Sequence, residues 1–153
     1  MAHRTAIARM MQAYWRMTRS LTLGAQGCIL DGEGRVLLIR HTYRPGWHFP
    51  GGGVERGEAT LTALTRELDE EAGVELTGPP RLFGIYTNFR VFPGDHIALF
   101  VVREFVQPVA PVPTREIAEH GFFARDRLPE GTITPVRSRL AEILDGKAVS
   151  ATW

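Results

Sequence analysis

Apolar residues recur with two different periods along this chain, and each period predicts a different kind of element. Apolar and β-branched runs bounded by turn residues predict strands at 20–30, 35–41, 82–92, 96–105 and 121–124. The turn at 31–34 predicts that the first two strands form a hairpin, and the turn at 93–95 predicts the same for the third and fourth. We expect the strand at 35–41 to be buried on both faces.

Apolar residues spaced three and four apart predict helices at 59–72 and 135–145. Leu64 and Leu68 lie on the apolar stripe of the first helix, and Gly73 stands where a helix C-terminal cap belongs. Helices around a sheet that contains several hairpins predict a mixed α/β (α+β) sandwich.

The first nineteen residues predict a further, amphipathic helix that precedes the domain. Arg9 and Arg16 interrupt the apolar core that a signal peptide would need. We expect this helix, over 1–19, to pack on the domain or to form the face of a homodimer. Contact with a membrane surface is the alternative that its basic residues leave open.

Length and composition indicate one globular domain over 20–153 after that helix. The chain has 153 residues, of which 44% are hydrophobic and 23% charged, a composition that excludes a disordered tail, a collagen and a coiled coil. No apolar run reaches the roughly 20 residues that cross a bilayer, so no membrane span is expected. The one cysteine, Cys28, excludes an intrachain disulfide and fits a reducing, cytoplasmic location.

Charge is unevenly distributed although the net charge is only +1. Residues 1–46 carry seven arginines against two acidic residues, a balance of +5, and residues 47–80 carry seven acidic residues against two arginines, a balance of −5. Without a basic field over the whole chain, no specific nucleic-acid binding is expected. The acidic segment must instead be solvated, paired or bound to cations.

Three carboxylates of the helix at 59–72 lie on one face. Glu67, Glu70 and Glu71 are separated by three and four residues, so their like charges repel and destabilise the helix unless something compensates them. A hard cation such as Mg²⁺ or Mn²⁺ removes that repulsion, and Glu58 can add a fourth carboxylate. Arg66 can pair with Glu70 one turn on. A solvated acidic helix face is the alternative.

The spacing around these carboxylates matches a longer pattern. A glycine, a glutamate, an Arg-Glu pair with an aliphatic residue, a Glu-Glu pair and a Gly-aliphatic pair fall at fixed intervals: Gly52, Glu58, Arg66, Glu67, Leu68, Glu70, Glu71, Gly73 and Val74. With no departure from the signature, this segment resembles the Nudix hydrolase family. The resemblance implies an α/β/α sandwich with a mixed central sheet.

The resemblance also implies roles for particular residues. It makes Glu67, Glu70 and Glu71 metal ligands and catalytic residues, with the Gly51 carbonyl as a further ligand. It makes Glu58 a supporting carboxylate near the metal and Arg66 an orienting residue. The cofactor that it implies is Mg²⁺ or Mn²⁺.

The general base varies within this family, and so do the residues that bind the substrate. The base can be a glutamate of the signature or one from a later loop, where Glu116 is favoured over Glu119; a surface charge is the alternative for Glu116. Other candidates flank the glycine-rich segment: Arg40 and Arg44 for substrate phosphates, and Tyr43 and Trp47 for stacking on a base, with exposed arginines and core aromatics as the alternatives.

The expected function is therefore that of a divalent-metal-dependent pyrophosphohydrolase. Its substrate would be a small nucleotide, a nucleoside diphosphate linked to another moiety, and nucleoside triphosphates and nucleotide sugars such as ADP-ribose both remain open. A non-catalytic Nudix-fold nucleotide-binding regulatory module is the alternative. The complete set of signature carboxylates favours the enzyme.

Overall fold

A computed structural model describes residues 11, 14, 21–109 and 111–153 of the chain. The predicted helix over 1–19 therefore lies almost entirely outside the described residues. The described helices are α2 (Thr60–Ala72) and α3 (Thr134–Asp145), and neither is long and apolar enough to cross a membrane. The described strands are β1 (Thr22–Ile29), β2 (Val36–His41), β3 (Trp47–His48), β4 (Gly51–Gly53), β5 (Glu75–Leu76), β6 (Arg81–Thr87), β7 (Asp95–Val102), β8 (Phe105–Val106) and β9 (Ile117–Phe123).

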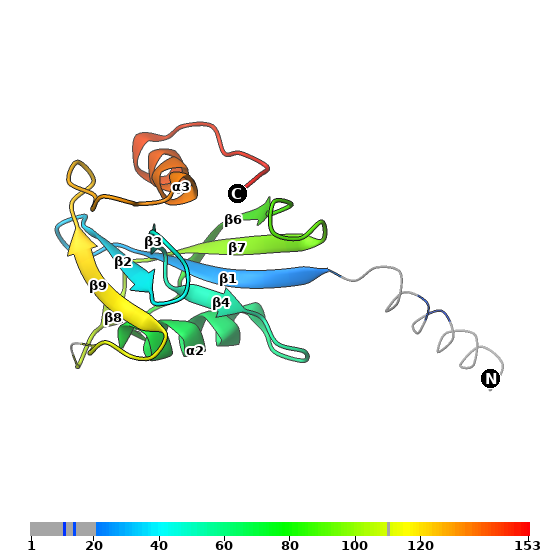
Figure 1. The fold of residues 1–153 in the computed structure, drawn as a ribbon, viewed down its shortest axis with the longest axis horizontal. Helices are drawn as coiled ribbons and strands as arrows, with labels where there is room; N and C mark the ends of the chain where they lie inside the picture. Colours follow the sequence, from blue (N-terminus) through cyan, green and yellow to red (C-terminus); the bar gives the residue numbers. More distant parts are fainter. Residues whose placement is uncertain (1–10, 12–13, 15–20, 110) are drawn as a thin grey trace.

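The strands form a mixed sheet and two smaller ones. The main sheet has the order β4-β1-β7-β6, in which β1 and β7 run parallel and the other neighbours are antiparallel. A second sheet has the order β3-β2-β9, and β5 pairs with β8. Figure 1 shows β2 and β9 beside one end of the main sheet. The mixed sheet that was predicted is confirmed.

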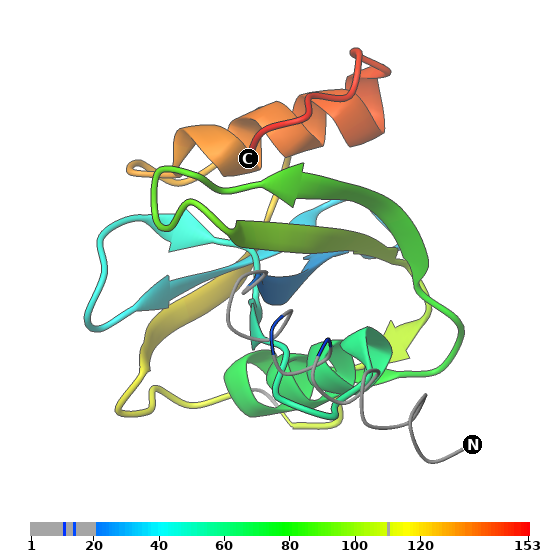
Figure 2. The ribbon, with the colours of Figure 1, turned by 90° about the vertical axis from the view of Figure 1, so that its right-hand side faces the viewer.

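Helices cover both faces of the main sheet, α3 on one side and α2 on the other (Figures 1 and 2). Successive side chains of a strand point to opposite faces, and β7 follows this rule. Its Ala98 and Phe100 pack in the cluster that contains Leu64 of α2, while Leu99 packs in the cluster that contains Leu140 of α3. This is the predicted α/β/α sandwich.

Local signals place α2 as the sequence predicts. The helix ends at Gly73, whose left-handed backbone lets its N–H bond to the carbonyl of Asp69 at 2.9 Å. Gly27 of β1 lies under the helix, where an added Cβ would sit 3.1 Å from a methyl group of Leu68. The absence of a side chain at Gly27 lets α2 approach the sheet closely.

The predicted hairpin of the first two strands is wrong. β1 and β2 belong to different sheets and share one isolated bridge, between Leu30 and Val36. The turn between them is closed by Asp31, whose carboxylate accepts hydrogen bonds from the backbone N–H groups of Glu33 at 3.0 Å and Arg35 at 2.8 Å. After this turn the chain leaves the main sheet, and β2 packs against that sheet as part of the second one. Val36 to Ile39 are therefore buried on both faces, as predicted.

Other strand boundaries also differ from the prediction. The strand predicted over 82–92 ends at Thr87, because the Asn88 carbonyl accepts the N–H of Val91 at 3.0 Å and closes a turn. The short strand predicted over 121–124 is β9, which begins at Ile117 and pairs along β2. The glycine-rich segment contains two short strands, β3 and β4, and Gly51–Gly53 pairs with β1.

Candidate active site

Residues from α2 and from the segment before β9 face one cavity of about 290 Å³. About forty residues of sequence separate the two segments, and the sheet brings them together. The cavity is lined by Glu67, Glu70, Glu71, Thr114, Arg115, Glu116 and Ile117. The candidate base Glu116 therefore lies at the same cavity as the three helix carboxylates.

Glu71 is the buried carboxylate of this cavity. Its side chain is held against the glycine-rich segment, where Oε2 accepts the backbone N–H of Gly51 at 2.7 Å, and the residue is 9% exposed. Burial raises the pKa of Glu71 to about 7; the Gly51 N–H and Arg44 oppose that shift, and the charges of Glu67 and Glu116 add to it. The cavity thus gathers more negative charge than its own hydrogen bonds balance.

Arg66 engages two signature carboxylates directly. It forms a forked contact with Glu58, Nε to Oε1 at 3.1 Å and Nη2 to Oε2 at 3.2 Å, and its Nη1 donates to Glu67 Oε1 at 2.6 Å. These bonds raise the pKa of Arg66 and lower that of Glu58. The pair expected between Arg66 and Glu70 is also present, as a longer ion pair of 3.7 Å to an exposed carboxylate.

Two glycines before α2 lie in close contact with neighbouring groups, and at Gly51 the neighbour is backbone that cannot move aside. Gly51 has a φ of +142°, and a Cβ there would lie 2.2 Å from the carbonyl oxygen of Ala25. At Gly52 the same atom would lie 2.5 Å from the carboxyl carbon of Glu67, whereas at Gly53 no atom lies within 4 Å. The backbone therefore passes directly beneath the helix carboxylates.

The position of Glu116 is set by a turn and by the end of β2. Thr114 Oγ1 accepts the backbone N–H groups of Glu116 at 3.2 Å and Ile117 at 2.9 Å. The N–H of Thr42 donates to the Glu116 carbonyl at 2.8 Å, and the Thr42 hydroxyl donates to the Arg115 carbonyl at 2.7 Å. These bonds bring the Glu116 backbone to the edge of the cavity.

The residues predicted to bind substrate are placed differently from one another. Arg40 forms an ion pair with Glu119 across β2 and β9, and neither residue lines the cavity. Tyr43 is 68% exposed, with its ring 5.0 Å from that of His41. Trp47 is 8% exposed and packs edge-on against Phe123, so the structure puts its indole in the core rather than at the cavity.

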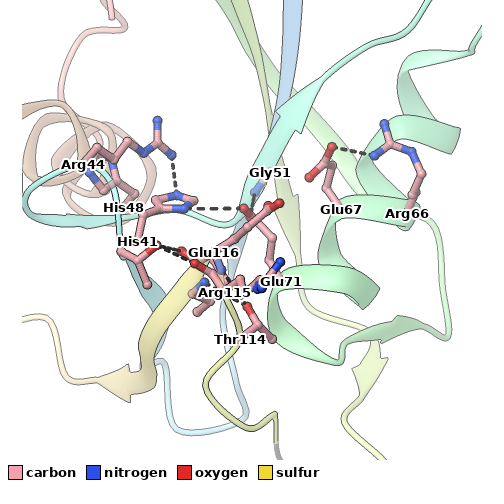
Figure 3. A network of polar contacts seen from close by, with 12 residues as sticks. His41, Arg44, His48, Gly51, Arg66, Glu67, Glu71, Thr114, Arg115 and Glu116 are labelled. Atoms are coloured by element: carbon pink, nitrogen blue, oxygen red, sulfur yellow. Dashed lines mark hydrogen bonds and ion pairs between the residues drawn. The ribbon is translucent and has the colours of Figure 1, made fainter.

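Sequence reasoning missed His41, which lies between Arg44 and Glu71 (Figure 3). Arg44 Nη2 lies 2.6 Å from His41 Nε2, and His41 Nδ1 lies 3.9 Å from Glu71 Oε1. Burial lowers the pKa of His41 to about 4, with smaller contributions from Arg44 and His48. The available signal was a polar residue that ends an otherwise buried strand.

The chemistry of the cavity fits a hard divalent cation. Its four carboxylates, from Glu67, Glu70, Glu71 and Glu116, supply oxygen atoms only, which are the ligands that Mg²⁺ and Mn²⁺ prefer. In the described part of the chain no three His, Cys, Asp or Glu side chains converge tightly enough to hold an ion in their present rotamers. Figure 3 shows the reason at Glu67, which is turned toward Arg66. Metal binding would require this side chain to rotate.

Fold and site together define an α/β/α sandwich domain in which an acidic helix, held against a glycine-rich segment, and the segment before β9 line one cavity. The family model of the NUDIX domain matches residues 21–145, so the chain belongs to the Nudix hydrolase family. The predicted family is thereby confirmed.

Curated relatives match through part of their length. The chain is 39% identical over 70 residues to YvcI of Bacillus subtilis (strain 168), named an uncharacterized Nudix hydrolase, a match that covers 46% of this chain and 43% of the relative. It is 48% identical over 46 residues to an RNA pyrophosphohydrolase of Halorhodospira halophila, covering 30% of this chain and 25% of the relative. The matches thus span less than half the length of these curated relatives.

Solved structures match more completely. A MutT NUDIX hydrolase from Burkholderia pseudomallei superposes with a TM-score of 0.69 at 25% identity, over 81% of this chain and 98% of that structure. An ADP-ribose pyrophosphatase from Streptococcus suis gives a TM-score of 0.63 at 22% identity, over 87% and 98%. The second likeness shows the fold alone.

The glycine contacts predict different outcomes for adjacent substitutions. Gly51→Ala should lower the free energy of unfolding by about 1 to 3 kcal/mol, because its Cβ meets a backbone oxygen that cannot move aside. Gly53→Ala, the matched control two residues on, should leave it within about 0.5 kcal/mol of the wild type. Urea unfolding followed by circular dichroism measures both, and equal stabilities would contradict the close packing of Gly51 against Ala25.

Proposed function

We propose that this chain is a divalent-metal-dependent pyrophosphohydrolase. Its substrate class is a nucleoside diphosphate linked to another moiety, either a nucleoside triphosphate or a nucleotide sugar such as ADP-ribose. The observation that carries the proposal is the cavity itself, where three carboxylates of α2 meet Glu116 from before β9. The complete Nudix signature around those carboxylates supports it.

The residues present divide the chemistry between them. A bound Mg²⁺ or Mn²⁺ would neutralise the diphosphate, position it and lower the pKa of bound water. Glu67, Glu70 and Glu71 are the proposed ligands, together with the Gly51 carbonyl. Glu58 is the proposed supporting carboxylate, and it acts through Arg66, which it holds by both oxygens.

Glu116 is the proposed general base. It faces the cavity from the side opposite α2, so its carboxylate can accept the proton of a water molecule that attacks the diphosphate. Its turn is held by Thr114 and Thr42 independently of the helix. A glutamate of α2 that acted as the general base would first have to stop binding the metal ion. Glu116 is not a proposed metal ligand, so it is favoured as the base.

Substrate contacts are proposed for the segment that follows β2. Arg44 and the exposed Tyr43 lie beside His41, which faces Glu71, so they are suitably placed for a phosphate and a base. Arg40 would first have to leave Glu119. Relatives are named RNA pyrophosphohydrolase, and a fold neighbour is named ADP-ribose pyrophosphatase. Both names refer to cleavage of a diphosphate bond, and only this feature enters the proposal for this chain. A homodimer and a cytoplasmic location stay predictions.

A nucleotide panel tests the proposal. Purified protein, treated with a chelator and then supplied with Mg²⁺ or Mn²⁺, is incubated with nucleoside triphosphates and nucleotide sugars, and products are separated by ion-exchange chromatography. We expect cleavage of at least one class between two phosphates, and none while the chelator is in excess. Thermal stabilisation by a nucleotide without any product would instead support the regulatory module.

Substitution of Glu71 tests the assignment of the helix carboxylates. Glu71→Gln should lower kcat by about 10³-fold, since it removes a charge next to the proposed ion, while circular dichroism stays that of the wild type. Asp69→Asn is the matched control, because Asp69 is exposed on the same helix and does not line the cavity. Wild-type turnover in a folded Glu71→Gln protein would reject the assignment.

Glu116 and Glu119 form a second matched pair. Removal of a general base typically costs 10²- to 10⁴-fold, so Glu116→Gln should lower kcat by about that factor with little change in KM. Glu119→Gln removes the same charge three residues on, outside the cavity, and should stay within about threefold of the wild type. Steady-state kinetics across pH measures both, and an equal loss in the two variants would contradict the role of Glu116.

A further inference from the structure

We propose that His41 is a positioning residue for Glu71, to whose carboxylate it presents its Nδ1–H. Arg44 in turn fixes which imidazole nitrogen carries that proton. The inference rests on the proposed function, because it treats Glu71 as a metal ligand. It adds a contact that comes from β2 rather than from the signature segment.

The burial of His41 makes this contact costly to leave unmade. The residue is 4% exposed, and its Nδ1 is a buried polar atom that has no hydrogen-bond partner among the described residues. Its nearest carboxylate oxygen is Glu71 Oε1, at 3.9 Å. A buried donor without a partner is destabilising, so it favours any movement of Glu71 that closes this gap.

The donor inventory decides the tautomer. A guanidinium has N–H donors and no acceptor, so the 2.6 Å contact from Arg44 Nη2 requires His41 Nε2 to accept. In a neutral imidazole the proton must then sit on Nδ1, the nitrogen that faces Glu71. Arg44 and Glu71 contact opposite sides of the ring, as Figure 3 shows.

The two oxygens of Glu71 are thereby assigned different neighbours. Oε2 accepts the Gly51 N–H at 2.7 Å, and Oε1 faces His41. A displacement of about 1 Å would bring Oε1 to ordinary hydrogen-bond distance. With both oxygens held by donors on the sheet side, the carboxylate plane is fixed and its remaining lone pairs are directed toward the cavity.

The backbone of β2 explains why His41 reaches this position. The pairing of β2 with β9 shifts register between Arg40 and His41. Before that shift, Arg40 pairs with Glu119 at the surface, whereas His41, the next residue, points to the opposite face and is buried. The pairing of β2 with β9 thus places the His41 side chain on the side of Glu71.

The tautomer is tested on the wild-type protein without metal or substrate. Long-range ¹H–¹⁵N correlation spectra distinguish the protonated from the unprotonated ring nitrogen of each histidine, and His41 is assigned from the spectrum of His41→Asn. We expect the proton on Nδ1. A proton on Nε2 overturns the proposal, whatever the enzyme does.

Metal affinity tests the positioning itself. Residues that hold metal ligands through hydrogen bonds typically change affinity or activity by 10- to 100-fold, so His41→Leu should weaken Mn²⁺ binding by about that factor. His41→Asn keeps an N–H near the place of Nδ1 and should stay within about threefold. His96→Asn is the control, because His96 is bonded to the Gly94 carbonyl and does not line the cavity. Calorimetric titration with Mn²⁺ measures all three.

The outcomes separate this proposal from the proposed function. If folded His41→Leu binds Mn²⁺ as the wild type does, or if His41→Asn is as weak as His41→Leu, the positioning role is wrong although hydrolysis stands. If the wild type binds no Mn²⁺ and cleaves no nucleotide, the proposed function fails instead, and with it the reason for positioning Glu71. If His41→Leu does not fold, the Mn²⁺ affinity of His41→Asn and the tautomer of His41 in the wild type test the proposal.

Discussion

Crowding of like charge around a buried carboxylate is the constraint on which the site depends. Glu71 is removed from water beneath β4, and Glu67 and Glu116 share its cavity. Burial is the main reason why the pKa of Glu71 lies above that of an ordinary glutamate, and the two neighbouring charges add to that shift. The sandwich must therefore hold together a group of side chains that would otherwise separate.

Backbone packing supplies that restraint. Because Gly27 brings α2 close to β1 and Gly51 passes against Ala25, the helix and the glycine-rich strand are held at one separation. The Gly51 N–H and the Arg66 guanidinium then each engage one carboxylate of the helix. A larger residue at Gly51 would meet the carbonyl oxygen of Ala25, and one at Gly27 would press on Leu68, so both glycines help to set the position of the helix that carries the carboxylates.

Features encoded by neighbouring residues could be predicted from the sequence, and features set by distant contacts could not. The helix at 59–72 and its cap at Gly73 are encoded by neighbouring residues, and the observed helix starts one residue later than predicted. The partner of β1 is β7, about seventy residues later, and no local signal excludes the turn at 31–34 as a hairpin. The position of Trp47 in the core also depends on distant contacts. An aromatic residue in a glycine-rich segment has the same sequence pattern whether it lies on the surface or in the core.

His41 shows the same limit at the level of the site. A histidine at the end of an apolar strand has no motif of its own, and its meaning comes from Glu71, thirty residues later. Glu116 could be proposed because a known family directs attention to a carboxylate in a loop after the signature segment. A residue that acts only by positioning another residue has no such guide. It can be recognised only once the structure shows the contact between the two side chains.

A second buried glutamate in the described chain shows what a satisfied carboxylate looks like. Glu142 of α3 is 7% exposed, and its Oε1 accepts both Arg139 Nη2 at 2.6 Å and the N–H of Ser150 at 3.0 Å. Its Oε2 accepts the Tyr86 hydroxyl at 2.9 Å. That carboxylate has three donors, one of which is a buried cation, and it holds α3 to β6 and to the C-terminal segment.

Glu71 is buried to a similar degree, but its surroundings are of the opposite kind. It has one backbone donor at hydrogen-bond distance, a histidine donor just beyond it, and two like charges at the same cavity. A protein able to build the environment of Glu142 has no structural need for that of Glu71, because a carboxylate with so few donors weakens the fold. The difference is best explained by a cation that completes the second environment, and the diphosphate chemistry proposed for this chain supplies the reason to bind one.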